Sequence, residues 1–248
     1  MIYRAAFFSN FTALFKYSFM IKKIVLLWFG ILAFSACHNS KNTGNLLVEG
    51  TVKGLRLGTL QIKQLQKDSL VVVDSVKVDG NEKFAFHTTI DEPQVMVLAL
   101  PEVKDGRILF FAAPNDTIHI FTFVESFGLN PIVKGGINQT EKNAYDKMIK
   151  QFNNKEMDLF KAKFEAGKQH LLQEADSLGK KLDNLQRKRK LYTLNFIFRN
   201  KDKAIAPYIA MMEFYNNPKA LDTIYKTLPE SLKQSVYAKQ IKKILEQK

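Results

Sequence analysis

The stretch "LVVVDSVKVDGNEKFAFHTTI", residues 70–90, decides the fold that we expect for the first half of the chain. In residues 83–87, Phe84 and Phe86 alternate against Lys83 and His87, which is the two-residue period of a β-strand. Asp79-Gly80-Asn81, residues that tolerate positive φ and commonly close hairpins, separate this run from the preceding one. About seven such runs lie between residues 46 and 133, so the sequence predicts an antiparallel β-sandwich or small barrel.

Two of the expected strands are apolar on both faces. They are residues 95–100 and residues 118–123, and in the second of them His119 shares its face with Phe121 and Phe123. A strand of this kind is usually covered on both sides. The second half of the same chain is the simpler candidate for this cover, and a bound partner is the alternative.

Beyond Gly135-Gly136 the apolar period becomes that of helices, and Thr140 is expected near the first N-cap. Three apolar stripes follow: Tyr145, Ile149, Phe152, Phe160 and Phe164; then Leu171, Ala175, Leu178, Leu182 and Leu185; then Ile205, Tyr208, Ile209, Met212 and Tyr215. The second stripe alternates spacings of four and three, as in a helix–helix seam. Two shorter helices are expected over residues 219–228 and 229–246. The predicted class is α+β, with the β-domain followed by a C-terminal helical bundle whose stripes form its core.

The only cysteine, Cys37, ends the stretch "MIKKIVLLWFGILAFSAC", residues 20–37. Two lysines, an apolar run over residues 24–34 and the small pair Ser35-Ala36 are the parts of a secretory signal. The run is shorter than the roughly 20 residues that span a bilayer. With Cys37 directly behind it, the stretch resembles a bacterial lipoprotein signal, in which that thiol is acylated and becomes the new N-terminus. Ordinary cleavage that leaves a free thiol is the alternative.

The position three before Cys37 usually carries Leu in such signals and carries Phe34 here, a relaxed form that occurs in Bacteroidetes. We therefore interpret residues 1–36 as an over-long start plus a lipoprotein signal peptide, and residues 37–45 as a tether. The tether sequence "HNSKNTG" lacks the acidic run associated with surface export in Bacteroidetes lipoproteins. The expected location is the cell envelope, lipid-anchored in the outer membrane and facing the periplasm.

The residues that carry common chemistry are sparse. Once Cys37 is acylated, a disulfide framework, a CxxC pair, a zinc–thiolate site and a cysteine nucleophile each need a cysteine that the sequence does not have. The histidines, His38, His87, His119 and His170, are not at metal-ligand spacing, and the sequence contains no phosphate-loop, nucleotide-binding, serine-elbow or zinc-protease motif. We expect no catalytic residue, no cofactor and no metal.

Charge divides the sequence near residue 140. Residues 37–140 carry ten Lys and Arg against eleven Asp and Glu, whereas residues 141–248 carry 23 against 13, a net charge of +10. An exported protein does not meet nucleic acid, so the candidate partners of this basic half are anionic lipid headgroups, acidic sugars or an acidic protein. The run "RKRK", residues 187–190, belongs to it. A solvated helical face is the simpler interpretation.

Four segments carry a family resemblance: "VEGTVKGLRLGTLQIKQL" (48–65), "DSVKVDGNEKFAF" (74–86), "VKGGINQTEKNAYDKM" (133–148) and "APYIAMMEFYNNPKALDTIYKTLPESLKQSVYAKQIKKIL" (206–245). They resemble the N-terminal region of Bacteroidetes thioredoxin-like lipoproteins, a β-domain catalogued as domain of unknown function 4369 followed by a helical connector. The resemblance spans about residues 46–246. It implies a β-domain over residues 46–135 and a helical domain over residues 136–248.

In the longer relatives a thioredoxin-fold domain with a CxxC pair follows, and this sequence ends where that domain would start. The redox activity is therefore not carried over. Our first hypothesis is a non-catalytic, membrane-anchored lipoprotein that binds a protein, with an envelope redox protein as one candidate. A small-ligand or glycan-binding module is the second, which a groove lined by Phe121 and Phe123 would favour. An unrecognised hydrolase is the third, which requires clustered carboxylates or histidines.

Overall fold

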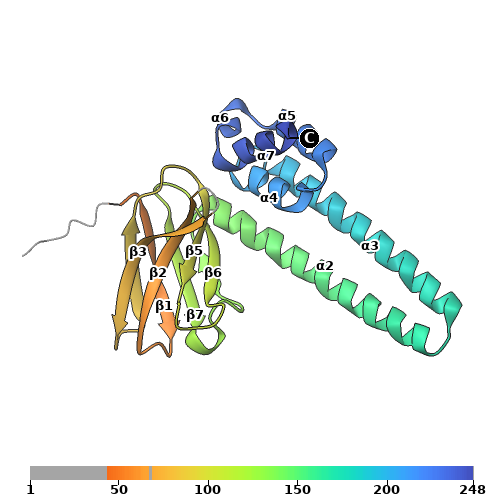
Figure 1. Cartoon of the computed structure of the whole chain (residues 1–248), viewed down its shortest axis with the longest axis horizontal. Helices are drawn as coiled ribbons and strands as arrows, with labels where there is room; N and C mark the ends of the chain where they lie inside the picture. Colours follow the sequence, from red (N-terminus) through yellow and green to blue (C-terminus); the bar gives the residue numbers. More distant parts are fainter. Residues whose placement is uncertain (1–43, 67–68, 248) are drawn as a thin grey trace, which may run out of the picture. The chain divides into compact units, whose positions relative to one another are not determined.

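The computed structural model describes residues 44–66 and 69–247 (Figure 1). Cys37, the predicted signal peptide and most of the predicted tether lie outside these residues. Within the described ranges, no helix is both long enough and apolar enough to cross a bilayer.

Eight strands form two four-stranded sheets, so the expected α+β class with a β-region before the helices is confirmed. We call the sheet with strand order β4-β1-β7-β8 sheet A and the sheet with order β3-β2-β5-β6 sheet B. The strands are β1 (Leu46–Lys53), β2 (Leu57–Gln66), β3 (Ser69–Asp79), β4 (Lys83–Thr88), β5 (Gln94–Ala99), β6 (Arg107–Ala112), β7 (Thr117–Phe123) and β8 (Ile132–Lys134).

One strand pair departs from the antiparallel arrangement that we expected. β1 and β7 run parallel, with Val48 opposite Ile118 and Glu49 opposite His119, whereas the other pairs in the two sheets are antiparallel. The strands β2 to β6 lie between β1 and β7 in the sequence. A connection of that length leaves the direction of β7 free, because only a short hairpin forces two strands to be antiparallel.

The turn at Asp79-Gly80-Asn81 is also used differently from our prediction. Gly80 does adopt a positive φ of 74°. However, β3 belongs to sheet B and β4 to sheet A, so the turn passes the chain from one sheet to the other instead of closing a hairpin. The Gly80 N–H donates to the Arg56 carbonyl at 2.8 Å, which ties the turn to the start of sheet B. A turn sequence specifies the local reversal but not which strands pair.

The inner faces of the two sheets pack against each other and form the core of the sandwich. Val48, Phe86 and Ile118 of sheet A and Leu60, Met96 and Phe110 of sheet B belong to one cluster, and each is at most 1% exposed. The burial of these side chains supplies the stability of the β-region, at about 1.5–3 kcal/mol for each large apolar side chain.

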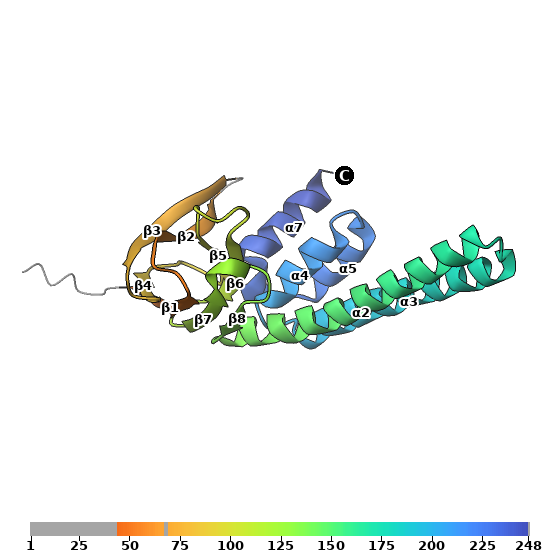
Figure 2. The same cartoon turned by 90° about the horizontal axis from the view of Figure 1, so that it is seen from below.

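Six helices follow the strands in the described part of the chain. They are α2 (Ile137–Lys168), α3 (Leu172–Arg199), α4 (Ile205–Phe214), α5 (Pro218–Thr227), α6 (Glu230–Lys233) and α7 (Val236–Glu246). The helix expected over residues 229–246 is thus two helices, because Ser235 is extended, with ψ of 156°, and interrupts the helical backbone between them. α2 and α3 lie side by side along their length in both views (Figures 1 and 2).

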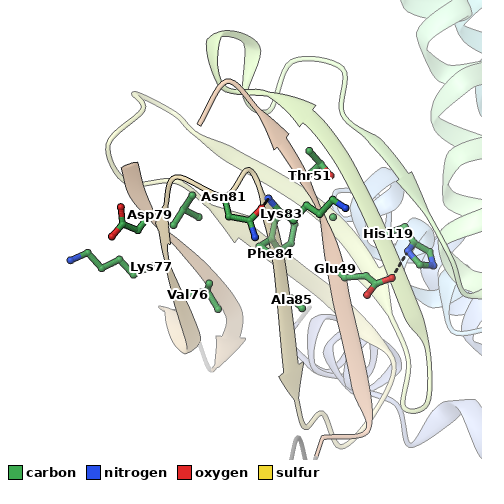
Figure 3. A pocket seen from close by; sticks show the side chains of 12 residues that line it. Glu49, Thr51, Val76, Lys77, Asp79, Asn81, Lys83, Phe84, Ala85 and His119 are labelled. Atoms are coloured by element: carbon green, nitrogen blue, oxygen red, sulfur yellow. Dashed lines mark hydrogen bonds and ion pairs between the residues drawn. The ribbon is translucent and has the colours of Figure 1, made fainter. Parts of the chain in front are cut away.

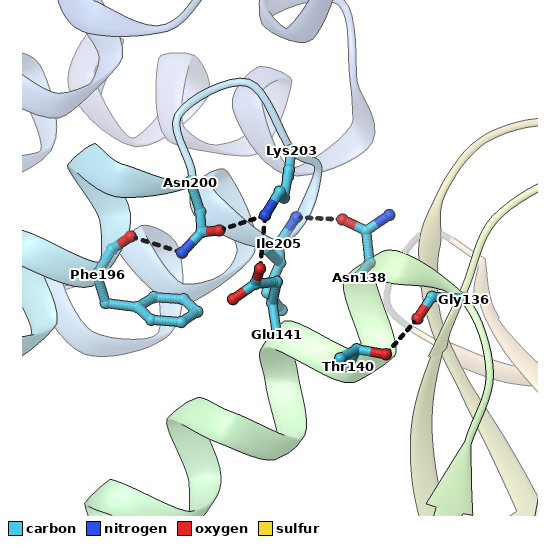
Figure 4. A network of polar contacts seen from close by, with 8 residues as sticks. All are labelled: Gly136, Asn138, Thr140, Glu141, Phe196, Asn200, Lys203 and Ile205. Carbon is cyan, nitrogen blue, oxygen red and sulfur yellow. Dashed lines mark hydrogen bonds and ion pairs between the residues drawn. The ribbon is translucent and has the colours of Figure 1, made fainter.

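The first helix begins earlier than we expected, at Ile137 and not near Thr140. Gly135, with φ of 112°, passes so close to β7 that a Cβ atom would overlap the Thr117 carbonyl oxygen. Thr140 therefore lies inside the first turn, where its hydroxyl donates to the Gly136 carbonyl at 2.8 Å (Figure 4). The two glycines end the sheet and position the start of α2.

A polar network joins the start of α2 to the end of α3 and the start of α4 (Figure 4). The side-chain oxygen of Asn138 accepts from the Ile205 N–H at 3.0 Å. Lys203 Nζ donates to Glu141 and to Asn200 Oδ1, and the Asn200 amide donates to the Phe196 carbonyl. Asn138 and Asn200 are buried, so these bonds satisfy polar groups that would otherwise destabilise the helical region.

The helical half covers the outer face of β5 and β6, as expected for the first of the two doubly apolar strands. Phe111, opposite Val95 in the sheet, is fully buried, and its ring lies 5.8 Å from that of Tyr208 and 6.1 Å from that of Tyr237. Tyr237 Oη accepts from the Val95 N–H at 2.7 Å, and Gln139 Oε1 accepts from the Phe111 N–H at 2.6 Å. The helices therefore also satisfy backbone groups of sheet B.

Candidate binding surface

The outer face of sheet A is exposed in the described part of the chain. Along β7, Ile118, Ile120 and Thr122 are buried, whereas Phe121 and Phe123 are 38% and 51% exposed. The helical half therefore does not cover the outer face of this strand, so the simpler of our two expectations is wrong for the described residues, and cover by a bound partner stays a prediction. The apolar residues of a strand indicate that both of its faces can be buried, but not which element will cover them. The helices pack on sheet B, so this face of sheet A has no second layer among the described residues.

Three apolar side chains form a continuous feature on this face, which we call the aromatic patch: Phe121, Phe123 and Ile132. The two rings pack edge to face, with centroids 5.3 Å apart and planes at 82°. Ile132 of β8 lies opposite Phe121 in the strand register and is 52% exposed. Exposed apolar clusters on a rigid sheet mark interaction sites more often than isolated exposed residues do.

A groove of about 740 Å³ lies beside the aromatic patch, and Figure 3 shows the residues that line it. Residues of β1, β3 and β4 and the turn between the last two line it, together with His119 of β7. A smaller hollow of about 340 Å³ contains Phe121, Ile132 and Lys134. Thr51 and His119 line both hollows, so the groove and the patch form one surface.

The groove brings together an acid and a base that the sequence does not place near each other. His119 Nδ1 lies 3.1 Å from Glu49 Oε1 (Figure 3), and their side chains are 56% and 41% exposed. A pair with this exposure contributes about 1 kcal/mol or less to stability. The contact follows from the parallel register of β1 and β7, which no local pattern predicted.

The remaining charges around the patch are mostly positive. Thr51 of β1 lies opposite Lys83 on one side and Phe121 on the other, and His119 lies opposite Lys134. Lys134 thus lies on β8, the strand that carries Ile132, and Lys83 lies on β4, with β1 between it and Phe121, while the Glu49 carboxylate is engaged by His119. The outer face of sheet A therefore combines apolar contacts with a border suited to acidic groups.

Two histidines other than His119 lie in separate elements of the described residues. His87 lies in β4 and His170 in the turn between α2 and α3, where its φ is 57°. Across residues 44–66 and 69–247, no group of three or more His, Cys, Asp or Glu side chains could hold a metal ion. Cys37, the predicted lipid attachment residue, lies outside the described residues.

The basic run at residues 187–190 is not uniformly solvated. Arg187, Lys188 and Lys190 are exposed on α3. Arg189 instead faces α4, where its Nη2 donates to both carboxylate oxygens of Glu213 at 3.1 and 3.0 Å. Arg189 thus joins two helices, and three residues of the run are free to meet a partner.

The comparison with known families concerns the β-region. A family model described as Domain of unknown function (DUF4369) matches residues 46–141. These residues form a DUF4369 domain. The domain contains the eight strands and extends into the first turns of α2. No curated protein and no solved structure matches the chain.

Proposed function

We propose that the chain is a non-catalytic lipoprotein of the cell envelope whose DUF4369 domain binds a protein partner through the outer face of sheet A. The observation that carries this proposal is the aromatic patch, which a sheet displays beside a groove with both polar and apolar lining residues. Protein interfaces are enriched in aromatic anchors at their centre and are bordered by polar side chains. The patch and the lysines on β4 and β8 have this composition.

The support beneath the patch favours binding without rearrangement. On the opposite side of β7, Ile118 and Ile120 are at most 1% exposed in the sandwich core. Phe121 and Phe123 are therefore held by strands whose other faces are fully packed. Side chains held in place before binding lose less conformational entropy when a partner docks.

The charges indicate what kind of partner fits. Lys134 lies on the same strand as Ile132, and Lys83 lies one strand beyond Thr51, so a partner segment with apolar side chains and Asp or Glu near them would meet both the patch and these lysines. The resemblance to thioredoxin-like lipoproteins makes an envelope redox protein one candidate. A lipid on Cys37 would hold the domain at the outer membrane, facing the periplasm.

Affinity capture from the cell envelope tests the proposal with a matched pair of variants. We expect Phe121→Ser combined with Phe123→Ser to lose a protein that the wild type captures, because the anchors are removed while the core face of β7 is unchanged. The control, Leu172→Ser, changes a side chain that is 75% exposed on α3 and should capture the same protein as the wild type. Equal capture by all three chains would refute the use of this face.

The anchoring part of the proposal has its own measurement. Wild-type chain should partition into the detergent phase after membrane extraction, and Cys37→Ser should remain unprocessed or become soluble. Mass spectrometry of the wild-type N-terminus should show an acylated cysteine. A wild-type chain with a free thiol at position 37 would contradict lipidation without bearing on the sheet A surface.

A small-ligand or glycan-binding function is the second candidate, and the groove favours it. Polar side chains of Lys77, Asp79, Asn81 and Lys83 line its wall, with Phe121 in the adjoining hollow. Sugars are commonly held by such hydrogen-bonding groups beside an aromatic ring. Titration with anionic and neutral oligosaccharides, followed by amide chemical shifts, should perturb β1, β3 and β4 if this function is correct. Shift changes confined to other elements would exclude the groove.

A further inference from the structure

We infer that the chain associates with a second copy of itself through the half of the α2–α3 hairpin that contains its turn. This surface is separate from the outer face of sheet A. Between residues 155 and 186, the side-chain hydrogen bonds and ion pairs given by the structure join only residues of α2 and α3. The two helices lie against each other there, and one face of α2 has no neighbour among the described residues.

α2 carries two apolar stripes, and the second lies in this half. The first faces α3: Phe152 lies 5.9 Å from Tyr192, measured between ring centroids, and Ala166 is 5% exposed. The second consists of Met157, Phe160, Phe164 and Gly167, which we call the outer stripe. Its spacings of three, four and three are those of a helix–helix seam.

The outer stripe is exposed, which corrects the interpretation of Phe160 and Phe164 as core residues. Met157, Phe160 and Phe164 are 54%, 59% and 56% exposed. Leu171 and Leu172 extend the apolar surface at the turn and are 45% and 75% exposed. The sequence pattern was correct about the helical period, but this chain supplies no partner for the stripe within its described residues.

Gly167 gives a second reason to expect another helix here. A groove of about 520 Å³ lies against it, lined by Phe160, Phe164 and Ala175 among others. A Cβ atom at Gly167 would find no heavy atom within 4 Å, so the described contacts do not require a glycine. Glycine inside a helix is about 1 kcal/mol less favourable than alanine. The absence of a side chain would let a helix from outside approach the backbone closely.

Charge favours a second copy over an anionic membrane. Residues 155–183 carry six Lys and six Asp or Glu, a net charge of zero, within a helical half whose net charge is +10. Two copies can therefore approach without net repulsion, and each offers both signs to the other. An anionic lipid surface would instead attract the strongly basic parts of the chain. A two-fold axis would bring the same stripe from both copies together.

The exposed apolar side chains supply part of the surface that a dimer needs. An aromatic side chain buries roughly 150–250 Å² when fully covered, so the half-exposed rings of Phe160 and Phe164 offer about 200 Å² per copy, and Met157, Leu171 and Leu172 add to it. Stable interfaces bury about 800 Å² per partner, and the aliphatic stems of neighbouring lysines can contribute to the remainder. Lys168 already lies over Phe164, with Nζ 4.5 Å from the ring centroid.

Sedimentation of the full chain in detergent tests the inference. The wild type should form a dimer whose population rises with concentration, and Phe160→Glu combined with Phe164→Glu should raise the dimer dissociation constant at least about tenfold, or 1.4 kcal/mol. The matched control, Phe121→Glu combined with Phe123→Glu, places the same charges on sheet A and should remain dimeric. Because the control carries the same N-terminal segment as the wild type, it accounts for any association through that segment.

A second variant tests the same surface in case the first variant does not fold. Gly167→Leu fits the open space at that position and should weaken the dimer while the thermal melting midpoint does not fall. A wild-type chain that stays monomeric at every concentration, or a dimer that neither variant weakens, would overturn the inference. Binding of the monomer to phosphatidylglycerol vesicles, lost in the Phe160→Glu and Phe164→Glu chain, would also overturn it and identify a membrane as the occupant.

Discussion

Tyr237 shows how a single side chain couples the helices to sheet B. Its hydroxyl oxygen accepts from the Val95 N–H at 2.7 Å, and the residue is 6% exposed, with its ring beside that of Phe111. Tyr237→Phe keeps the ring but leaves a backbone donor without its acceptor. We expect the free energy of unfolding to fall by about 1–3 kcal/mol in urea titrations. Tyr215→Phe, at a residue 57% exposed, should change it by about 0.5 kcal/mol or less.

The same residue predicts a pH dependence. Burial raises the pKa of Tyr237 above its ordinary value, and the bond from Val95 opposes this only in part. The unfolded state therefore releases its phenol proton first, above about pH 10. The stabilisation is complete below that pH and is lost as the pH rises toward the folded pKa. Melting curves should show a smaller alkaline loss for Tyr237→Phe than for wild type, and equal losses would contradict the assignment.

Leu178 tests the α2–α3 hairpin as a helical element. It is 8% exposed in the seam between the helices, as the alternating spacing predicted. Leu178→Ala should lower the free energy of unfolding by about 2–5 kcal/mol, through lost burial and the cavity that remains. Leu172→Ala, the same change at a residue 75% exposed, should have little effect on the monomer. Similar losses in the two variants would show that the seam is not packed.

The strands and helices differ in how far sequence could predict them. The alternation in residues 83–87 and the spacing from Leu171 to Leu185 are local signals, and each produced the expected element. The direction of β7 and the sheet to which β4 belongs depend on pairing between distant residues, which a turn such as the one at Gly80 does not encode. The Glu49–His119 contact was missed for this reason. A stripe such as Phe160 and Phe164 predicts a helix but not whether its partner is in the same chain.

The net positive charge of the helical half is a property of the whole molecule. Its contribution to binding can be tested by changing the exposed residues of the basic run. Arg187, Lys188 and Lys190 are exposed, whereas Arg189 must be kept because it binds Glu213. Replacing those three residues with Gln should weaken association with the captured partner or with anionic vesicles, and more so at low salt. Salt screens exposed charges over about 10 Å at 0.1 M ionic strength. Stability should change by about 0.5 kcal/mol or less at each exposed site.

A second variant with three substitutions distinguishes a local effect of the basic run from an effect of the total charge. Lys219, Lys239 and Lys243 are also exposed, and replacing them with Gln lowers the charge by the same amount elsewhere in the helical half. If the run is a docking site, only the first triple should reduce the slope of binding against salt. If both variants reduce the slope equally, the basic half attracts its partner through its long-range electric field and not through a local contact, because such attraction depends on the summed charge. If neither does, residues 187–190 are a solvated face of α3.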